Sequence, residues 1–228
     1  MYTNVNLAAT LGALALIGTC LLLIVLALGS VYFLIRRRSA PARLTFLAIA
    51  LIAGIYLAAM LIFAFRSHEY LLSRGEEKYF CELDCHLAYS LTAVSETTSL
   101  GEGRDLITAA GVFRIVTIKT RFDETTIGPT RGDGLLYPNS RVVTISDANG
   151  KQYFPVPKAQ TALEKSHAAG TAMTIPLRPG ESYTTSLVFD LPAEFKAGTL
   201  LIQEGELTTR FVIGHENSLF HKKTRFRI

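Results

Sequence analysis

The first 65 residues of this chain contain no aspartate and no glutamate, although the whole sequence has 19 acidic side chains. The same stretch holds four basic side chains, so the formal net charge of +4 comes entirely from them. Residues 66–228 carry equal numbers of acidic and basic side chains. A balanced domain lacks the clustered positive charge that a nucleic-acid-binding surface needs, so we expect no nucleic-acid partner.

Two long apolar runs occupy the N-terminal part, at about residues 7–35 and 44–65. Each run exceeds the ~20 residues that a helix needs to cross ~30 Å of hydrocarbon. Core helices of soluble proteins rarely stay apolar on every face for that long. The first run also lacks the basic start of a secretory signal peptide and is longer than the apolar core of one. The sequence therefore predicts a transmembrane hairpin over residues 1–65.

The loop between the two spans, residues 36–43, is half arginine. Short basic loops stay on the cytoplasmic side of a membrane. We therefore expect a multi-pass protein of the inner (cytoplasmic) membrane, with both termini and the C-terminal domain outside, in the periplasm or the extracellular space. Neither span contains an acidic, basic or histidine side chain, which ion and proton pathways usually need, so a channel or transporter is not expected. The residues that determine this topology are Arg36, Arg37, Arg38 and Arg43.

The remaining chain is predicted to comprise a charged connector, residues 66–80, and a β-rich domain, residues 81–228. Short alternating or β-branched runs are separated by turn signals such as Asn149-Gly150, which suits a tight hairpin. Because helices do not alternate with the strands, an antiparallel sandwich is the expected closure. The expected elements are strands at 87–94, 111–122, 141–146, 151–154, 182–191, 199–203 and 208–213, an edge strand at 221–228, and a short helix at 159–170.

The stretch Leu177–Pro192, LRPGESYTTSLVFDLP, resembles a segment common in immunoglobulin-like (Ig-like) domains of bacterial envelope proteins. That resemblance implies an Ig-like sandwich and no specific activity. Antibody domains have two sandwich cysteines that flank a tryptophan in the sequence. This sequence has no tryptophan, so the antibody pattern is absent. The expected fold class is therefore a two-helix transmembrane hairpin followed by an antiparallel Ig-like β-sandwich.

The segment Cys81–His86 is the densest group of chemically versatile side chains. Outside the cytoplasm, two nearby cysteines usually form a disulfide, and a turn can bring their Cα atoms within ~5.5–6 Å. In a second interpretation the segment is a thiol-redox site or a copper or zinc site, because thiolates beside an imidazole suit those metals. In a third, both cysteines are simply buried small residues. The candidate metal ligands are Cys81, Cys85, His86, His215 and His221.

A two-helix hairpin followed by an outer β-sandwich also resembles subunit II of cytochrome c oxidase. The dinuclear copper motif of that family separates two cysteines by three residues, as Cys81 and Cys85 are separated here. The family places these cysteines near the end of the sandwich and its next histidine four residues later, whereas His86 is adjacent to Cys85. Its methionine ligand has no counterpart, since Met173 is the only methionine after the hairpin. The copper function is therefore not carried over.

Other motifs are weaker. Residues 120–126, TRFDETT, place Arg121, Asp123 and Glu124 after a strand, where a solvated ion pair is expected. No nucleophile elbow, phosphate loop or HExxH zinc motif is present. The sequence therefore predicts a non-catalytic, membrane-anchored binding or accessory subunit of an envelope complex, with no cofactor and with other membrane or envelope proteins as partners. The alternative is a copper- or zinc-binding or thiol-redox protein, active in respiratory-enzyme assembly through Cys81–His86.

Overall fold

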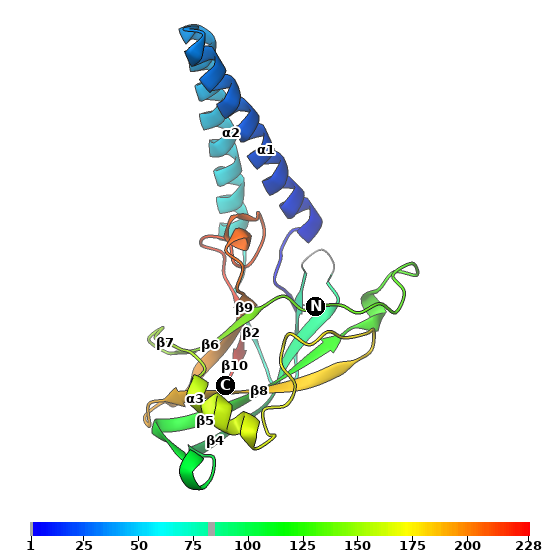
Figure 1. Ribbon diagram of the computed structural model, residues 1–228, viewed down its shortest axis with the longest axis vertical. Helices are drawn as coiled ribbons and strands as arrows, with labels where there is room; N and C mark the ends of the chain where they lie inside the picture. Colours follow the sequence, from blue (N-terminus) through cyan, green and yellow to red (C-terminus); the bar gives the residue numbers. More distant parts are fainter. Residues whose placement is uncertain (1, 82–84) are drawn as a thin grey trace. The chain divides into compact units, whose positions relative to one another are not determined.

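The computed structural model describes residues 2–81 and 85–228 (Figure 1). The chain divides into two compact units, each built from segments that are distant in sequence. The β unit comprises Met1–Asn4, Glu69–Glu206 and Lys223–Ile228. The helical unit comprises Val5–His68 and Leu207–Lys222.

Two long helices, α1 (Ala9–Ile35) and α2 (Ser39–Arg66), lie side by side in the helical unit (Figure 1). Both are long and apolar enough to cross a membrane. Only 6% of the residues in the most apolar stretch of either helix are buried. The core helices of a soluble protein bury such stretches, and in α1 and α2 they are exposed instead.

The connection between the helices is shorter than the predicted loop. The helix α2 begins at Ser39, which leaves Arg36–Arg38 between the helices and places Arg43 within α2. Proline at position 41 is compatible with this start, because backbone N–H groups in the first helical turn have no intrahelical acceptor. Near this end, the hydroxyls of Ser30 and Thr45 form a hydrogen bond of 2.7 Å between the helices.

The second part of the helical unit is Leu207–Lys222, here called the helix-end loop. A strand was expected at residues 208–213, and that prediction is wrong. Thr208–Phe211 forms a 3₁₀ turn, η3. The β-branched and aromatic composition favoured a strand, but the Phe211 carbonyl accepts from the hydroxyl of Tyr56 on α2 (2.6 Å). Next to this segment, the Gly214 carbonyl accepts from the N–H of Asn6, which precedes α1 (2.7 Å).

Within its described residues, the β unit contains two five-stranded sheets, one short helix and two 3₁₀ turns. The first sheet has the order β1 (Tyr2–Thr3), β3 (Glu77–Phe80), β4 (Leu87–Leu100), β5 (Ile107–Phe122) and β8 (Ser182–Leu191). The second has the order β2 (Tyr70–Leu72), β10 (Thr224–Arg227), β9 (Gly198–Glu204), β6 (Arg141–Asp147) and β7 (Gln152–Tyr153). The other elements are α3 (Pro157–Lys165), η1 (Gly103–Asp105) and η2 (Glu124–Thr126).

Both sheets are mixed, which corrects the expectation of antiparallel pairing throughout. The strand β1 runs parallel to β3, and β10 runs parallel to β2. Parallel neighbours need long crossover connections, and the helical hairpin and most of the β unit provide them. The β10 strand also lies between β2 and β9, so it is not the edge strand that was expected. The predicted connector, residues 66–80, contains β2 and β3.

The two sheets share one hydrophobic core. Alternate residues of β4 and β5, such as Tyr89 and Ile118, face alternate residues of β6 and β9, such as Ile145 and Ile202. The helix α3 packs against β5 and β8 through a separate small cluster (Figure 1). That cluster consists of Phe113, Ala159, Leu163, Ala169 and Val188.

Lys78 is fully buried and enters the core from β3. Its Nζ donates to the carbonyls of Ile202 (2.9 Å) and Thr224 (3.1 Å), which belong to the opposite sheet. A buried ammonium is costly unless it is hydrogen-bonded, and these contacts provide such bonds. Lys78 therefore links the two sheets at the end of the core where β3 begins.

Candidate functional site

Cys81 and Cys85 form a disulfide, as the first interpretation predicted. Cys81 follows β3 directly and Cys85 lies just before β4, so the bond closes the connection between two antiparallel neighbours. Their Cα atoms are 4.0 Å apart. Cys81 is buried, and its N–H donates to the side-chain oxygen of Asn4 (2.8 Å). Residues 82–84 lie outside the described residues.

His86 is held in place by the last residue of β5 and the segment that follows it. Its imidazole stacks on the ring of Phe122, with centroids 5.5 Å apart and planes inclined by 15°. Its Nδ1 lies 2.6 Å from the hydroxyl of Thr126, and its carbonyl accepts from the Asp123 N–H (2.8 Å). The side chain is only 7% exposed, so it contributes to a packed corner rather than to an open surface.

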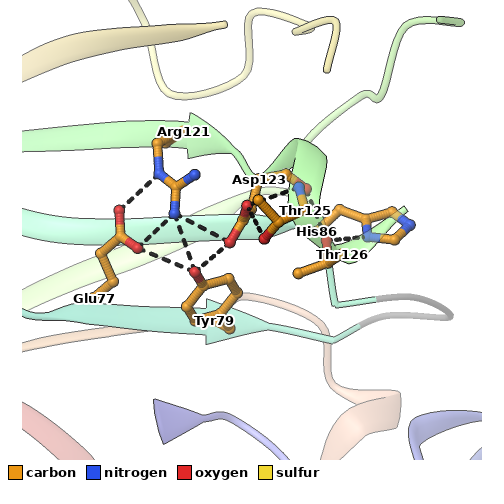
Figure 2. A network of polar contacts seen from close by, with 7 residues as sticks. All are labelled: Glu77, Tyr79, His86, Arg121, Asp123, Thr125 and Thr126. Atoms are coloured by element: carbon orange, nitrogen blue, oxygen red, sulfur yellow. Dashed lines mark hydrogen bonds and ion pairs between the residues drawn. The ribbon is translucent and has the colours of Figure 1, made fainter. Parts of the chain in front are cut away.

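A polar network extends from this corner along the first sheet (Figure 2). Arg121 at the end of β5 donates twice to the Glu77 carboxylate, at 2.8 and 2.7 Å. Its Nη2 also lies 3.1 Å from both the Tyr79 hydroxyl and Asp123 Oδ2. The Tyr79 hydroxyl donates to the same Asp123 oxygen at 2.5 Å. The other Asp123 oxygen accepts from the N–H and the hydroxyl of Thr125.

Strand register explains why these residues meet. Tyr79 lies opposite Ala88 on β4, and Ala88 lies opposite Arg121 on β5. The central strand thus places a methyl group between the two longer side chains, which can meet across it. Asp123 then caps η2 by accepting from the Thr125 N–H, which fixes its carboxylate beside Arg121. We define the Arg121 network as Glu77, Tyr79, Arg121, Asp123 and Thr125.

The electrostatics of the Arg121 network hold each member in one protonation state. Hydrogen bonds from Arg121 lower the pKa of Glu77. Burial alone would raise the pKa of Asp123, but hydrogen bonds from Arg121, Tyr79 and Thr125 outweigh it and hold that pKa well below its usual range. Burial, followed by the hydrogen bond to Asp123, raises the pKa of Tyr79. The hydrogen bond to Glu77, followed by that to Asp123, raises the pKa of Arg121.

This arrangement suits the fixing of strands rather than proton transfer. A general acid or base works best with a pKa near the operating pH, and each shift described above moves its group further from neutrality. The network instead ties the ends of β3 and β5 together next to the disulfide. The sequence predicted a solvated ion pair within the group Arg121, Asp123 and Glu124. The structure pairs Arg121 with Asp123, and the pair is not solvated as expected, since Asp123 is 4% exposed. Sequence reasoning missed Glu77 and Tyr79, because only strand register brings them to Arg121.

The two remaining metal candidates lie in the other unit. His215 and His221 belong to the helix-end loop, whereas Cys81, Cys85 and His86 belong to the β unit. The His215 Nδ1 accepts from the Asn217 N–H (3.0 Å), and the His221 Nδ1 lies 2.6 Å from the Lys222 carbonyl. Within residues 2–81 and 85–228, no three histidine, cysteine or acidic side chains are grouped to hold a metal ion. The two sulfurs would become thiolate ligands only after reduction of the disulfide.

A pocket of 610 Å³ lies elsewhere in the β unit, between β6, α3 and β8. Its lining is mainly apolar, with Gln160 and Thr185 among the polar exceptions. The Gln160 amide is already committed to the backbone of β8, where it bonds to Ser186 and Val188. The volume lies within the ~300–1,000 Å³ typical of small-ligand pockets. The apolar lining comprises Val142, Val143, Phe154, Pro155, Ala169, Ala172, Met173 and Leu187.

Comparison with known proteins gives no family. No family model matches the chain, and no curated protein matches it. Among solved structures, the chain is similar to a conserved hypothetical protein from Bacillus anthracis, with 14% identity and a TM-score of 0.38 over 51% of this chain and 82% of that one. MPT63, a secreted protein from Mycobacterium tuberculosis, gives 14% identity and a TM-score of 0.36 over 60% of this chain and 92% of that one. Neither likeness bears on the site.

Proposed function

We propose that this chain is a membrane-anchored, non-catalytic binding or accessory subunit of an envelope complex. The observation that carries the proposal is the position of β1. This strand precedes α1, yet it pairs with β3, which follows α2. The chain thus leaves the β unit, runs through two apolar helices and returns to the same unit. Such a path supports a hairpin that crosses the membrane twice, with both of its ends on one side.

The orientation follows from charge. Arg36–Arg38 lie between the helices, and Arg43 lies just beyond them in α2. Basic residues flanking membrane spans favour the cytoplasmic side, which puts the β unit outside. The Cys81–Cys85 disulfide supports this side, because disulfides persist in oxidising compartments. In this proposal the β unit is an Ig-like sandwich, whose two mixed sheets share one core.

A binding role fits the chemistry of the β unit better than catalysis does. The Arg121 network fixes charges in place, and the pocket beside α3 offers a mainly apolar recess to a side chain of a partner protein. Phe154 lines this pocket and is 58% exposed, so its ring is accessible to a partner. The partners expected are other membrane or envelope proteins.

Photo-crosslinking in living cells tests this role. A photoreactive phenylalanine analogue replaces Phe154, and the matched control carries it at Tyr137, an exposed aromatic residue outside the pocket lining. The proposal predicts a discrete crosslinked band for position 154 and none for position 137. Solubilisation in mild detergent should recover the same partner. A strictly monomeric protein without any crosslink at position 154 would count decisively against the accessory role.

A second candidate function is thiol redox or metal binding at Cys81–His86. The observation that favours it is the disulfide itself, which lies next to a histidine in sequence. The full-length protein is reduced, supplied with Cu(I) or Zn(II), and its retained metal is quantified after desalting. Stoichiometric metal that is lost in Cys81→Ser and Cys85→Ser supports this function, and no retained metal refutes the metal-binding form of it.

A further inference from the structure

The helix-end loop exposes an unusual amount of apolar surface. Phe220 is 73% exposed, Leu207 64%, Phe211 47% and Leu219 45%. Phe220 also has a φ of 62°, in the left-handed region that aromatic residues rarely adopt. Its ring stacks with that of Phe65, which is 72% exposed at the end of α2, with centroids 6.5 Å apart. A strained backbone that turns a large apolar ring outward indicates that the ring has a use there.

The loop lies alongside the helices rather than beyond their ends. The Phe211 carbonyl accepts from the hydroxyl of Tyr56, ten residues before the end of α2 and therefore ~15 Å along its axis. At the start of α1, a Cβ on Gly12 would lie 2.7 Å from the Ile213 carbonyl oxygen, so the helix and the loop backbone meet there. If α1 and α2 cross a membrane, the loop lies at the depth of their outer ends.

The charges of the loop complement an anionic surface. Its exposed charged side chains are the basic residues Arg210 and Lys222. Glu216, the only acidic residue in its sequence, is 2% exposed. Apolar side chains flanked by basic ones are typical of segments that lie in a membrane interface, where basic residues are attracted to anionic lipid head groups.

We propose that the helix-end loop is a membrane-interface segment, which contacts the lipids of the outer leaflet. Phe211, Leu219 and Phe220 enter the boundary between head groups and acyl chains, and Arg210 and Lys222 bind anionic head groups. The inference rests on the proposed membrane anchor. It adds a third point of membrane contact, contributed by a segment more than 140 residues after α2.

The absence of tryptophan from the chain makes a direct test possible. Single tryptophans are introduced as Phe220→Trp in the loop, Leu22→Trp in the middle of α1, and Phe154→Trp in the β unit. Each full-length variant is reconstituted in vesicles of phosphatidylcholine and phosphatidylglycerol, with or without bromine at an upper or a deep position of the acyl chains. Interfacial segments sit ~5–10 Å into the head-group boundary, so bromolipid should quench F220W about twofold. F154W should remain unquenched.

The three variants separate failure of this inference from failure of the anchor. If L22W is quenched but F220W behaves like F154W, the loop does not enter the membrane interface, although the hairpin does. If L22W is not quenched either, the proposed anchor itself is wrong. Leu219→Trp is tested in parallel, so that a local disturbance at the strained position 220 cannot decide the result. Purified protein in lipid vesicles has no other protein species beside it, and quenching therefore assigns this surface to lipid.

Discussion

Replacing Arg121 with methionine tests whether the Arg121 network holds the β unit together. The substitution keeps much of the apolar stem and removes the guanidinium that donates to Glu77 and Asp123. Removal of one partner from a fully buried ion pair costs about 3–5 kcal/mol, whereas an exposed pair contributes about 0–1 kcal/mol. The side chains of Arg121 and Glu77 are each 27% exposed and that of Asp123 is 6% exposed, so the network lies between these limits.

We expect Arg121→Met to lower the free energy of unfolding by about 2 kcal/mol at pH 7, which is ~4–8 °C in Tm for a domain of this size. Asp123 retains hydrogen bonds from Tyr79 and Thr125, which limits the loss. The assay is thermal unfolding of the full-length protein in detergent, followed by circular dichroism. The control is Lys119→Met, which removes the same charge two residues earlier on the same face of β5, outside the network.

The pH dependence gives a second test of the same substitution. The folded protein lowers the pKa values of Glu77 and Asp123, so their contribution to stability is present above the pKa values of the unfolded chain, about 4. That contribution is lost as the pH falls through the lower pKa values of the folded state. The difference between wild type and Arg121→Met should therefore shrink below about pH 4. A deficit equal to that of Lys119→Met, or one of the same size at pH 3 and pH 7, would refute the reasoning.

Three further outcomes are expected. Cys81→Ser/Cys85→Ser should cost only about 2 kcal/mol, because the closed loop is short, and mass spectrometry should show two hydrogens gained on reduction of the wild type. Gly12→Ala should loosen the helix-end loop and speed its cleavage by trypsin, since the added Cβ would meet a backbone oxygen, whereas Gly18→Ala, with open space around it, should not. Burial raises the pKa of Tyr183 to about 12. The free energy of unfolding should therefore fall as the pH rises above about 10, because the tyrosine ionises there in the unfolded chain before it does so in the folded one. Tyrosinate absorbance and unfolding measured as functions of pH check this.

Local patterns in the sequence were sufficient for several elements. The two apolar helices follow from run length, and the strand Ser182–Leu191 from its alternation and from the proline after it. The Cys81–Cys85 disulfide follows from the spacing of the cysteines and the expected compartment. In each case the information lies within a few consecutive residues or one continuous run.

Features that depend on distant segments could not be predicted in the same way. Glu77 and Arg121 are 44 residues apart and meet only through the registers of three strands. The direction of a strand is equally non-local. The sequence of β1 would be the same whether the strand ran parallel or antiparallel to β3, so the sequence does not reveal which. The segment 208–213 has the composition of a strand, but it packs next to helices, and these tertiary contacts decide its conformation.

Membrane topology is the central claim, and cysteine labelling in intact cells tests it most directly. Cys20→Ser removes the one free thiol, since the other two cysteines are bonded to each other. Asn149→Cys then places a thiol in the exposed turn between β6 and β7, and Arg37→Cys places one between the helices. In cells that have an outer membrane, that membrane is permeabilised first. A membrane-impermeant maleimide should then label N149C at once, and it should label R37C only after the inner membrane is opened. Labelling of R37C in intact cells, with N149C protected, would contradict the account.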